Sequence, residues 1–236
     1  MIPKIIHYCW FGGKELPQEV ENFIQTARNH MPEFEIKIWT DDNFDLTSHP
    51  FVQIAYKEKK WAFVSDFVRL KVLEEFGGIY MDTDVEVKQS LEKFLKHRAF
   101  AGCESEYYCG TATMGAVKGH PWIKRLLSYY DTPSLIEGDK LNVRTNVAII
   151  TEITQKEYGL LPVDEYQVLK DDIHIYPSDV FCAKDVETFE LKVTDSTYTI
   201  HHFSGSWLSP ATRLKLKIRK MIPPFLIKKY HQMRRI

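Results

Sequence analysis

Residues 77–85 read Gly-Gly-Ile-Tyr-Met-Asp-Thr-Asp-Val, a glycine pair followed by a short apolar segment and two carboxylates. Glycines directly after an amphipathic segment stop a helix, and the alternation from Ile79 to Val87 predicts a strand. In an extended chain Asp82 and Asp84 point the same way, about 6.5 Å apart. Charge at the end of a core strand is costly unless it serves a ligand. The stretch therefore predicts a site for Mg²⁺ or Mn²⁺ beside the phosphates of a nucleotide-bearing substrate.

Strand and helix patterns alternate on the amino-terminal side of this stretch. Apolar residues Val20, Phe23, Ile24 and Ala27 have the spacing of a helix that packs on a sheet. The expected elements are a strand over 2–10, a helix from residue 17, a strand around 36–38 and a helix over 61–76. This order predicts an α/β fold with a parallel sheet, whose ligands bind beyond the carboxyl ends of the strands. Phe11-Gly12-Gly13 and Asp82 to Asp84 both fall at such ends.

The pattern beyond Val87 is weaker. It predicts helices over 91–96, 121–130 and 146–158, and short strands over 173–176, 189–193 and 198–202. The sequence contains no internal repeat and no low-complexity linker.

Length and charge indicate one domain with a basic tail. The 236 residues, 44% of them hydrophobic, suffice for one sizeable core, which we place over residues 1–210. Residues 211–236 hold nine Lys or Arg and no acidic residue, so the rest of the chain has a net charge of −10. An acidic body argues against binding to nucleic acid, and the tail is a separate feature.

The cysteines and the amino terminus favour the cytoplasm. Four cysteines without a CxxC pair suggest neither a zinc site nor a disulfide framework. The first residues lack the apolar run of a signal peptide, and no segment reaches the roughly 18 apolar residues of a membrane span. We expect a cytoplasmic protein.

Two further clusters carry polar side chains. Asp66 and Arg69, three residues apart on the predicted helix, share a face and can pair, either as an ordinary surface pair or to hold a ribose or phosphate. Residues 201–207 read His-His-Phe-Ser-Gly-Ser-Trp after a predicted strand. One histidine faces in and the next faces out, and an inward imidazole can add a metal ligand. The following residues offer N–H groups and an aromatic face to a diphosphate and a sugar.

Four ordered segments together resemble one family: residues 2–12, 62–69, 77–84 and 202–207. They are similar to the glycosyltransferases of the DxD sugar-binding type (family 32), which include bacterial capsular and lipopolysaccharide transferases and yeast mannosyltransferases. The resemblance covers roughly residues 1–207. It implies a GT-A fold (a Rossmann-like, mostly parallel sheet flanked by helices), a nucleotide-sugar donor, Mn²⁺ or Mg²⁺, and retention of the anomeric configuration.

The resemblance also implies roles for individual residues. The nucleotide would contact His7, Trp10 and Phe11. Asp66 would hold the ribose or sugar of the donor, with Arg69 beside it. Asn146 is implied as a second catalytic candidate beside Asp66, and its other interpretation is the N-cap of the late helix.

The implied metal ligands are Asp82, Asp84 and His202, and Asp82 would also bind the ribose. Ser206 and Trp207 would close on the diphosphate. A cation held there stabilises the leaving nucleoside diphosphate.

The implied reaction is hexosyl transfer in cell-surface (capsular) polysaccharide synthesis. We expect UDP-galactose or UDP-glucose as the donor and a glycan or lipid-linked glycan as the acceptor, by analogy with the family. Since the sequence offers no clear nucleophile, front-face attack is favoured. Glu104 and Glu106 are either acceptor-side residues or plain loop charges.

Two other classes stay open. A glycoside hydrolase also uses paired carboxylates, about 5–5.5 Å apart in retaining enzymes. A non-catalytic, membrane-associated carbohydrate-binding protein is the second alternative. Apolar residues interleave with basic residues in the tail, which predicts an interfacial helix on an anionic membrane, at the inner face of the cell membrane. A solvated tail that covers the domain edge is the other interpretation.

Overall fold

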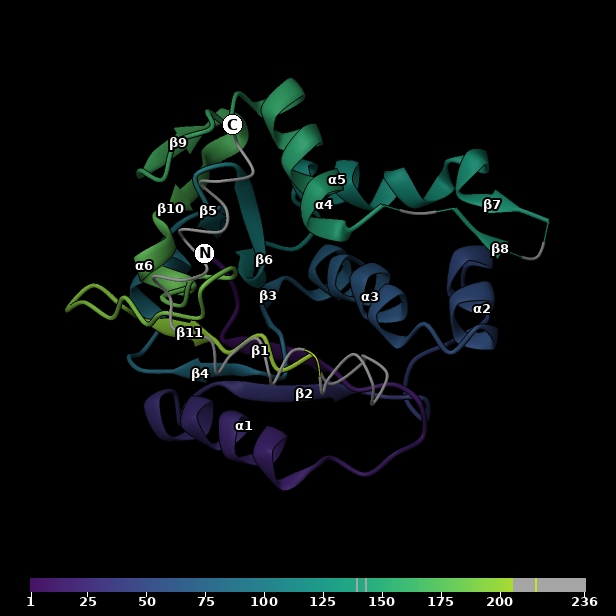
Figure 1. Cartoon of the computed structure of the whole chain (residues 1–236), viewed down its shortest axis with the longest axis horizontal. Helices are drawn as coiled ribbons and strands as arrows, with labels where there is room; N and C mark the ends of the chain where they lie inside the picture. The colour runs from purple at the N-terminus through teal and green to yellow at the C-terminus, as the bar shows by residue number, and fades with distance from the viewer. Residues whose placement is uncertain (139, 143, 206–214, 216–236) are drawn as a thin grey trace.

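The computed structural model describes residues 1–138, 140–142, 144–205 and 215, which form a central sheet with helices on both faces (Figure 1). The sheet has seven strands in the order β2-β1-β3-β6-β5-β10-β9. Their bounds are β1 Ile5–Cys9, β2 Glu35–Trp39, β3 Gly78–Met81, β5 Ala99–Ser105, β6 Tyr108–Ala116, β9 Gln167–Leu169 and β10 Ile173–Tyr176. Two small sheets pair β4 (Val85–Val87) with β11 (Thr199–His201) and β7 (Ile136–Glu137) with β8 (Lys140–Leu141).

The central sheet is mostly parallel, as predicted. Strands β2, β1, β3, β5 and β10 run in one direction, while β6 and β9 run against them. The carboxyl ends of β1 and β3 therefore meet at the same edge of the sheet.

Two hydrophobic cores fill the two faces of the sheet. One lies under α2 (Pro50–Lys57), α3 (Trp61–Phe76), α4 (Pro121–Leu127) and α5 (Asn146–Ile153). The other lies under α1 (Gln18–His30) and α6 (Ser178–Phe181). The apolar stripe predicted from Val20 to Ala27 faces this second core, because Val20, Ile24 and Ala27 are buried in it.

Helix α3 ends directly before the glycine pair, which leads into β3 of the central sheet. The helix is buried along much of its length and packs against β1, α2 and α4. It ends at Gly77, which has φ +69°, and a Cβ at this position would lie 2.6 Å from the backbone nitrogen of Lys118. At Gly78, with φ +106°, a Cβ would lie 2.7 Å from the Ile5 carbonyl oxygen. Only glycine combines these φ angles with such close approach, so the pair fixes where β3 begins.

The strand predicted over 79–87 is divided in two. Strand β3 belongs to the central sheet, β4 pairs with β11, and Asp82 to Asp84 form a tight turn between them. The aspartates therefore converge through a turn and not through the alternation of an extended strand.

Other predicted elements are present with shifted ends. The segment 91–96 contains a 3-10 helix (Glu92–Lys96), α4 continues as a 3-10 helix (Ser128–Asp131), and α5 continues as a π-helix (Thr154–Tyr158). The predicted strand over 189–193 is wrong, because within the described residues that segment makes only an isolated bridge between Lys184 and Leu191. Helix α2 and the hairpin of β5 and β6 were not predicted.

The predicted domain boundary at residue 210 and the basic tail, except for Lys215, lie outside the described residues. None of the helices that the structure describes is both long and apolar enough to cross a bilayer.

Candidate active site

The Asp82–Asp84 turn lies at the carboxyl end of β3. The Val85 N–H donates to the Asp82 carbonyl at 3.1 Å, and the Asp82 N–H donates to the Ala112 carbonyl of β6 at 2.8 Å. The Asp84 carboxylate accepts a hydrogen bond from the Ser204 N–H at 2.7 Å. The turn is thus held from two sides, by β6 and by the segment that follows β11.

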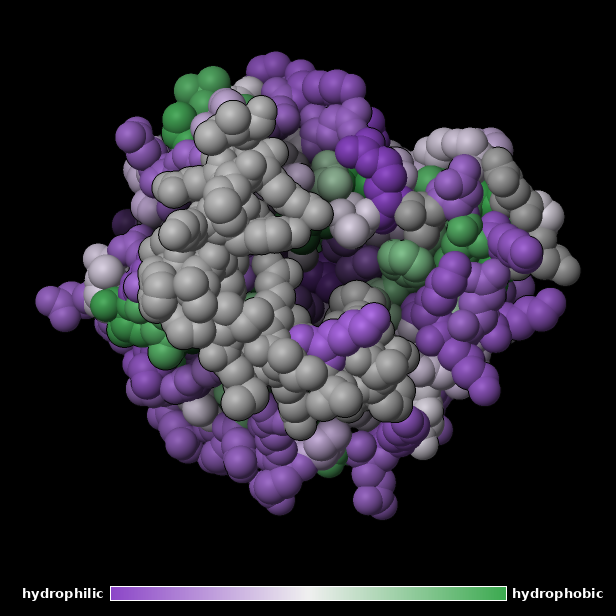
Figure 2. All heavy atoms as spheres, in the orientation of Figure 1, coloured by the Kyte–Doolittle hydropathy of each residue, from purple (hydrophilic) through white to green (hydrophobic). Residues whose placement is uncertain are grey.

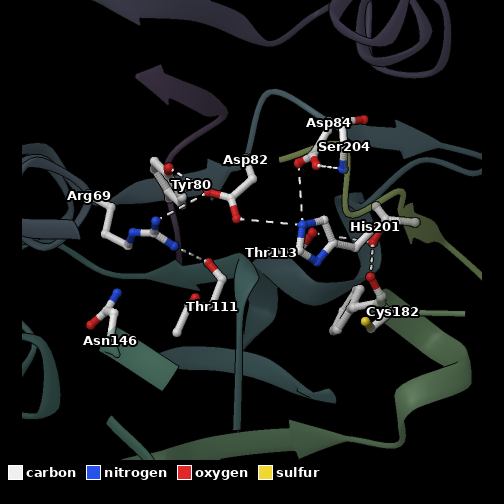
Figure 3. A network of polar contacts seen from close by, with 12 residues as sticks. Arg69, Tyr80, Asp82, Asp84, Thr111, Thr113, Asn146, Cys182, His201 and Ser204 are labelled. Atoms are coloured by element: carbon white, nitrogen blue, oxygen red, sulfur yellow. Dashed lines mark hydrogen bonds and ion pairs between the residues drawn. The ribbon is translucent and has the colours of Figure 1, made fainter. Parts of the chain in front are cut away.

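Strand β11 supplies a third side chain to this turn. His201 Nε2 lies 3.3 Å from Asp84 Oδ1 and 3.9 Å from Asp82 Oδ2 (Figure 3). One ligand atom of each residue lies within 4.8 Å of the others. Two carboxylate oxygens and one imidazole nitrogen suit Mn²⁺, and the carboxylates also suit Mg²⁺. The donor set therefore fits the cation that the sequence predicts.

The charges of Asp84 and His201 depend on each other. Burial raises the pKa of Asp84, but the facing His201 outweighs it and the pKa falls to about 2. Burial lowers the pKa of His201, but Asp84 raises it well above its usual value. The turn is thus a place where carboxylates attract positive charge.

The structure corrects the choice of histidine. His202 was expected as the third metal ligand, but its Nε2 lies 2.9 Å from Glu86 Oε2 and its ring stacks on Phe23 at 4.8 Å. Neighbouring residues of a strand point to opposite sides. The antiparallel register places His201 opposite Val85, and it is therefore His201 that faces the aspartates.

Arg69 links the aspartate turn to α3. Its guanidinium donates to Asp66 Oδ1 and to the Thr111 carbonyl, both at 2.9 Å, and lies 3.3 Å from Asp82 Oδ1. The Tyr80 hydroxyl donates to the same Asp82 oxygen at 2.7 Å, and the guanidinium lies 4.5 Å from the centre of its ring. Arg69 is only 5% exposed, so its charge is neutralised by the two carboxylates and does not reach solvent. The surface-pair interpretation of Asp66 and Arg69 is wrong.

Asn146 joins this cluster from the first turn of α5. Its Nδ2 donates to Asp66 Oδ1 at 3.1 Å. Thr145 precedes the helix as its N-cap residue, and neither residue makes a capping hydrogen bond through its side chain. The N-cap interpretation of Asn146 is therefore wrong. Burial raises the pKa of Asp66 to about 6, although the charge of Arg69 opposes this rise.

Buried polar atoms without partners gather around the turn. Four such side-chain atoms occur among the described residues, and three of them are Arg69 Nε, Asn146 Oδ1 and His201 Nδ1. Leaving such an atom unpaired costs about 1–3 kcal/mol. Their concentration at one place marks a site that a polar ligand or ordered water completes.

His7 is a structural residue, which corrects its expected contact with the nucleotide. It is fully buried, its Nδ1 accepts from Trp39 Nε1 at 3.1 Å, and its Nε2 then donates to the Gly77 carbonyl at 2.8 Å. Burial lowers the pKa of His7 to about 4. This neutral imidazole ties β1 to the glycine pair and faces no solvent.

The turn after β1 lies at the same sheet edge as the Asp82–Asp84 turn. Trp10 is half-buried and donates through Nε1 to the Lys14 carbonyl at 2.8 Å. The Phe11 ring is buried against Phe44, so its side chain belongs to the core and only its backbone is available to a nucleotide. The N–H groups of Gly12 and Gly13 donate to the Asp41 carboxylate.

Hydrophilic residues form the floor of a hollow near the centre of the face in Figure 2. Ser206 and Trp207, expected to close on the diphosphate, lie outside the described residues.

Sequence reasoning missed several contributors to the site. His201 was signalled by the histidine pair, but its direction depends on the pairing of β11 with β4. The Thr111 carbonyl and the Ser204 N–H are backbone groups that no side-chain pattern reveals. Tyr80 lies inside the quoted motif, and its hydroxyl takes part through tertiary contact.

Comparison with known sequences agrees with this geometry. Residues 17–101 match the family described as the glycosyltransferase sugar-binding region containing a DXD motif. Inositol phosphoceramide mannosyltransferase 3 of Schizosaccharomyces pombe is 30% identical over 130 residues, which are 53% of this chain and 36% of that protein. An uncharacterized glycosyltransferase of Acanthamoeba polyphaga mimivirus is 32% identical over 101 residues, 40% of each chain. The match thus spans little more than a third of the length of these relatives.

Comparison with solved structures concerns the fold alone. The glycosyltransferase GlyE of Streptococcus pneumoniae TIGR4 aligns over 94% of this chain and 62% of its own, with a TM-score of 0.50 and 10% sequence identity. The expected GT-A fold is confirmed.

Proposed function

We propose that this chain, whose residues 17–101 match the sugar-binding region of DXD glycosyltransferases, transfers a hexose from a nucleotide-sugar donor to a glycan or lipid-linked glycan. The observation that carries the proposal is the convergence of Asp82, Asp84 and His201 beside the cluster of Asp66, Arg69 and Asn146. A cation site next to a hydroxyl-binding cluster is what a sugar diphosphate requires.

The cation would be held by Asp82, Asp84 and His201. When bound, it supplies Lewis-acid stabilisation of the charge that develops on the departing diphosphate. The Ser204 N–H and Tyr80 hydroxyl hold the two carboxylates in place. Orientation by such neighbouring groups is typical of metal sites.

The sugar or ribose of the donor would lie against Asp66 and Asn146. Asp66 Oδ1 already accepts from Arg69 and Asn146, whereas Oδ2 has no hydrogen-bond partner among the described residues. Asn146 Oδ1 is unpaired as well. Two acceptor oxygens without a partner among the described residues, on side chains that bond each other, suit the hydroxyl groups of a sugar. Arg69 supports this site by holding Asp66 in place. Because its guanidinium is already paired with Asp66 and Asp82, Arg69 contributes little to the binding of a phosphate.

The named relatives make mannose a candidate sugar beside galactose and glucose, since the fission-yeast protein is a mannosyltransferase. We propose retention of the anomeric configuration by front-face attack. Proton NMR of the sugar released by donor hydrolysis, recorded before that sugar mutarotates, tests the proposed retention. A released sugar with the inverted anomeric configuration contradicts it.

The function is tested with UDP-galactose, UDP-glucose and GDP-mannose at 1 mM Mn²⁺. We expect one donor to be hydrolysed slowly without an acceptor, and the activity to vanish in EDTA and in Asp84→Asn. Full activity in EDTA would instead favour a glycoside hydrolase. Glycan binding without turnover of any donor would favour the non-catalytic alternative.

Residues 211–236 are proposed to bind an anionic membrane surface, which would place the protein at the inner face of the cell membrane. The support is the sequence pattern of nine basic residues interleaved with apolar ones. Truncation after Thr212 should abolish co-sedimentation with phosphatidylserine vesicles at low salt. Unchanged co-sedimentation contradicts the proposal.

A further inference from the structure

Glu104 lies at an irregularity in the pairing of β5 with β6. Cys103 pairs with Cys109 and Ser105 pairs with Tyr108, so two steps along β5 match one step along β6. Glu104 is the additional residue of this β-bulge. Bulges bend a strand, re-aim a side chain and are frequent next to active sites.

Glu104 lines a recess together with Cys182, which interacts with His201. It borders a cavity of about 10 Å³, room for about one water molecule, together with Thr113, Phe181 and Cys182. Among the residues that the structure describes, the half-buried carboxylate has no hydrogen-bond or ion-pair partner. A carboxyl group withdrawn from water without a partner costs free energy, and a ligand that donates a hydrogen bond would offset this cost.

Glu104 lies on the His201 side of the proposed metal site, opposite the cluster of Asp66, Arg69 and Asn146. Asp82 lies between Arg69, at 3.3 Å, and His201, at 3.9 Å. Burial raises the pKa of Glu104, the charge of His201 lowers it and that of Asp82 raises it, so Glu104 lies within electrostatic range of both. Figure 3 shows Arg69 and Asn146 on one side of Asp82, and His201 and Cys182 on the other. Glu104 shares its recess with Cys182.

We propose that Glu104 accepts a hydrogen bond from a hydroxyl group of the sugar acceptor and so positions it opposite the donor. The inference rests on the proposed function. If the donor occupies the Asp66 side of the cation, the opposite side is left for the acceptor, and Glu104 is an unpartnered hydrogen-bond acceptor there.

The β5–β6 hairpin beyond Glu104 exposes aromatic side chains of the kind that bind a sugar ring. Tyr107 is 55% exposed and Tyr108 47%, and both line a shallow groove with Leu161, which is 62% exposed. A sugar ring stacks its apolar face on aromatic side chains and directs its hydroxyl groups to polar ones. Cys103 lines both this groove and the recess of Glu104, and Ser105 next to Glu104 lines the groove, which supports a carbohydrate as the occupant.

The test compares Glu104→Gln with Glu19→Gln, a matched change at an exposed position of α1. The acceptor probes are the octyl glycosides of mannose, galactose and glucose. Four quantities are measured: transfer to these glycosides, hydrolysis of the donor without acceptor, Mn²⁺ affinity and the thermal midpoint.

We expect Glu104→Gln to lower kcat/KM for the acceptor by about tenfold or more, the effect of weakening a hydrogen bond to a charged group. Donor hydrolysis and Mn²⁺ affinity should stay within about threefold, and the thermal midpoint should not fall, because the change removes an unpartnered charge. Glu19→Gln should match the wild type in all four.

Three results would overturn the inference. Glu104→Gln could transfer sugar as well as the wild type does. It could lose Mn²⁺ affinity, which would make Glu104 a metal ligand. The wild type could hydrolyse a donor yet pass its sugar to none of the glycosides. Failure of the proposed function is distinct, because the wild type would then hydrolyse no donor.

Discussion

Replacing Arg69 with methionine should destabilise the protein strongly at neutral pH. The guanidinium is 5% exposed and serves Asp66, Asp82 and the Thr111 carbonyl. Methionine keeps much of the apolar stem but leaves both carboxylates without their cation. Removing one partner of a buried ion pair typically costs about 3–5 kcal/mol. We therefore expect Arg69→Met to lower the free energy of unfolding by roughly that amount.

The loss should depend on pH. Burial already raises the pKa of Asp66 to about 6 with Arg69 present, and removal of the guanidinium raises it further. A proton can then replace the missing charge, so the difference between variant and wild type should shrink as the pH falls from 8 to 5.5.

Urea denaturation followed by tryptophan fluorescence measures both effects. Arg125→Met is the matched control, because Arg125 pairs with Glu157 at 2.6 Å but is 38% exposed. An exposed pair contributes about 1 kcal/mol or less. A loss for Arg69→Met no larger than the control, or one that is independent of pH, would refute this account of the cluster.

Three further predictions follow from single residues. The folded protein holds the pKa of His7 at about 4 against 6.5 for an unperturbed histidine, so the stability that neutral His7 contributes is complete above pH 6.5 and declines towards pH 4. This decline amounts to about 3 kcal/mol, and urea titrations of His7→Gln should show a correspondingly shallower dependence on pH. Asn146→Ala should lower donor hydrolysis by at least about tenfold with an unchanged circular dichroism spectrum, since Asp66 loses a donor; turnover within twofold of the wild type contradicts this. Gly115→Ala places a Cβ against the Phe100 ring and should cost about 1–3 kcal/mol in urea denaturation, part of which Phe100→Leu in the same chain should restore.

The sequence predicted the parts of the fold that local pattern determines. Helix α3, its glycine stop and the strand that follows were predicted because helical periodicity and φ-positive glycines act over a few residues. The hairpin of β5 and β6 was missed because its strands are rich in alanine and glycine and carry few β-branched residues. Helix α2 had a signal that could have found it, since Pro50 follows His49, whose side chain accepts the capping hydrogen bond.

The candidate site was predicted as far as residue types allow. Asp82, Asp84, Asp66 and Arg69 were identified, and the structure brings them together. The alternation of a strand indicates that one of two adjacent histidines faces inward, but the register with β4 decides which one. His7 resembled a site residue from the sequence because no local pattern shows that Trp39 and Gly77 occupy both of its nitrogens.

We propose that Asp82, Asp84 and His201 form the cation site of the donor. Isothermal titration with Mn²⁺, in the presence of the nucleoside diphosphate of the preferred donor, measures the affinity of this site. We predict one Mn²⁺ site in the wild type and unchanged affinity in His202→Ala. In His201→Ala the affinity should fall at least about tenfold, because loss of a residue that only orients a metal ligand already costs about 10–100-fold. Loss of binding in His202→Ala with retention in His201→Ala would contradict the account.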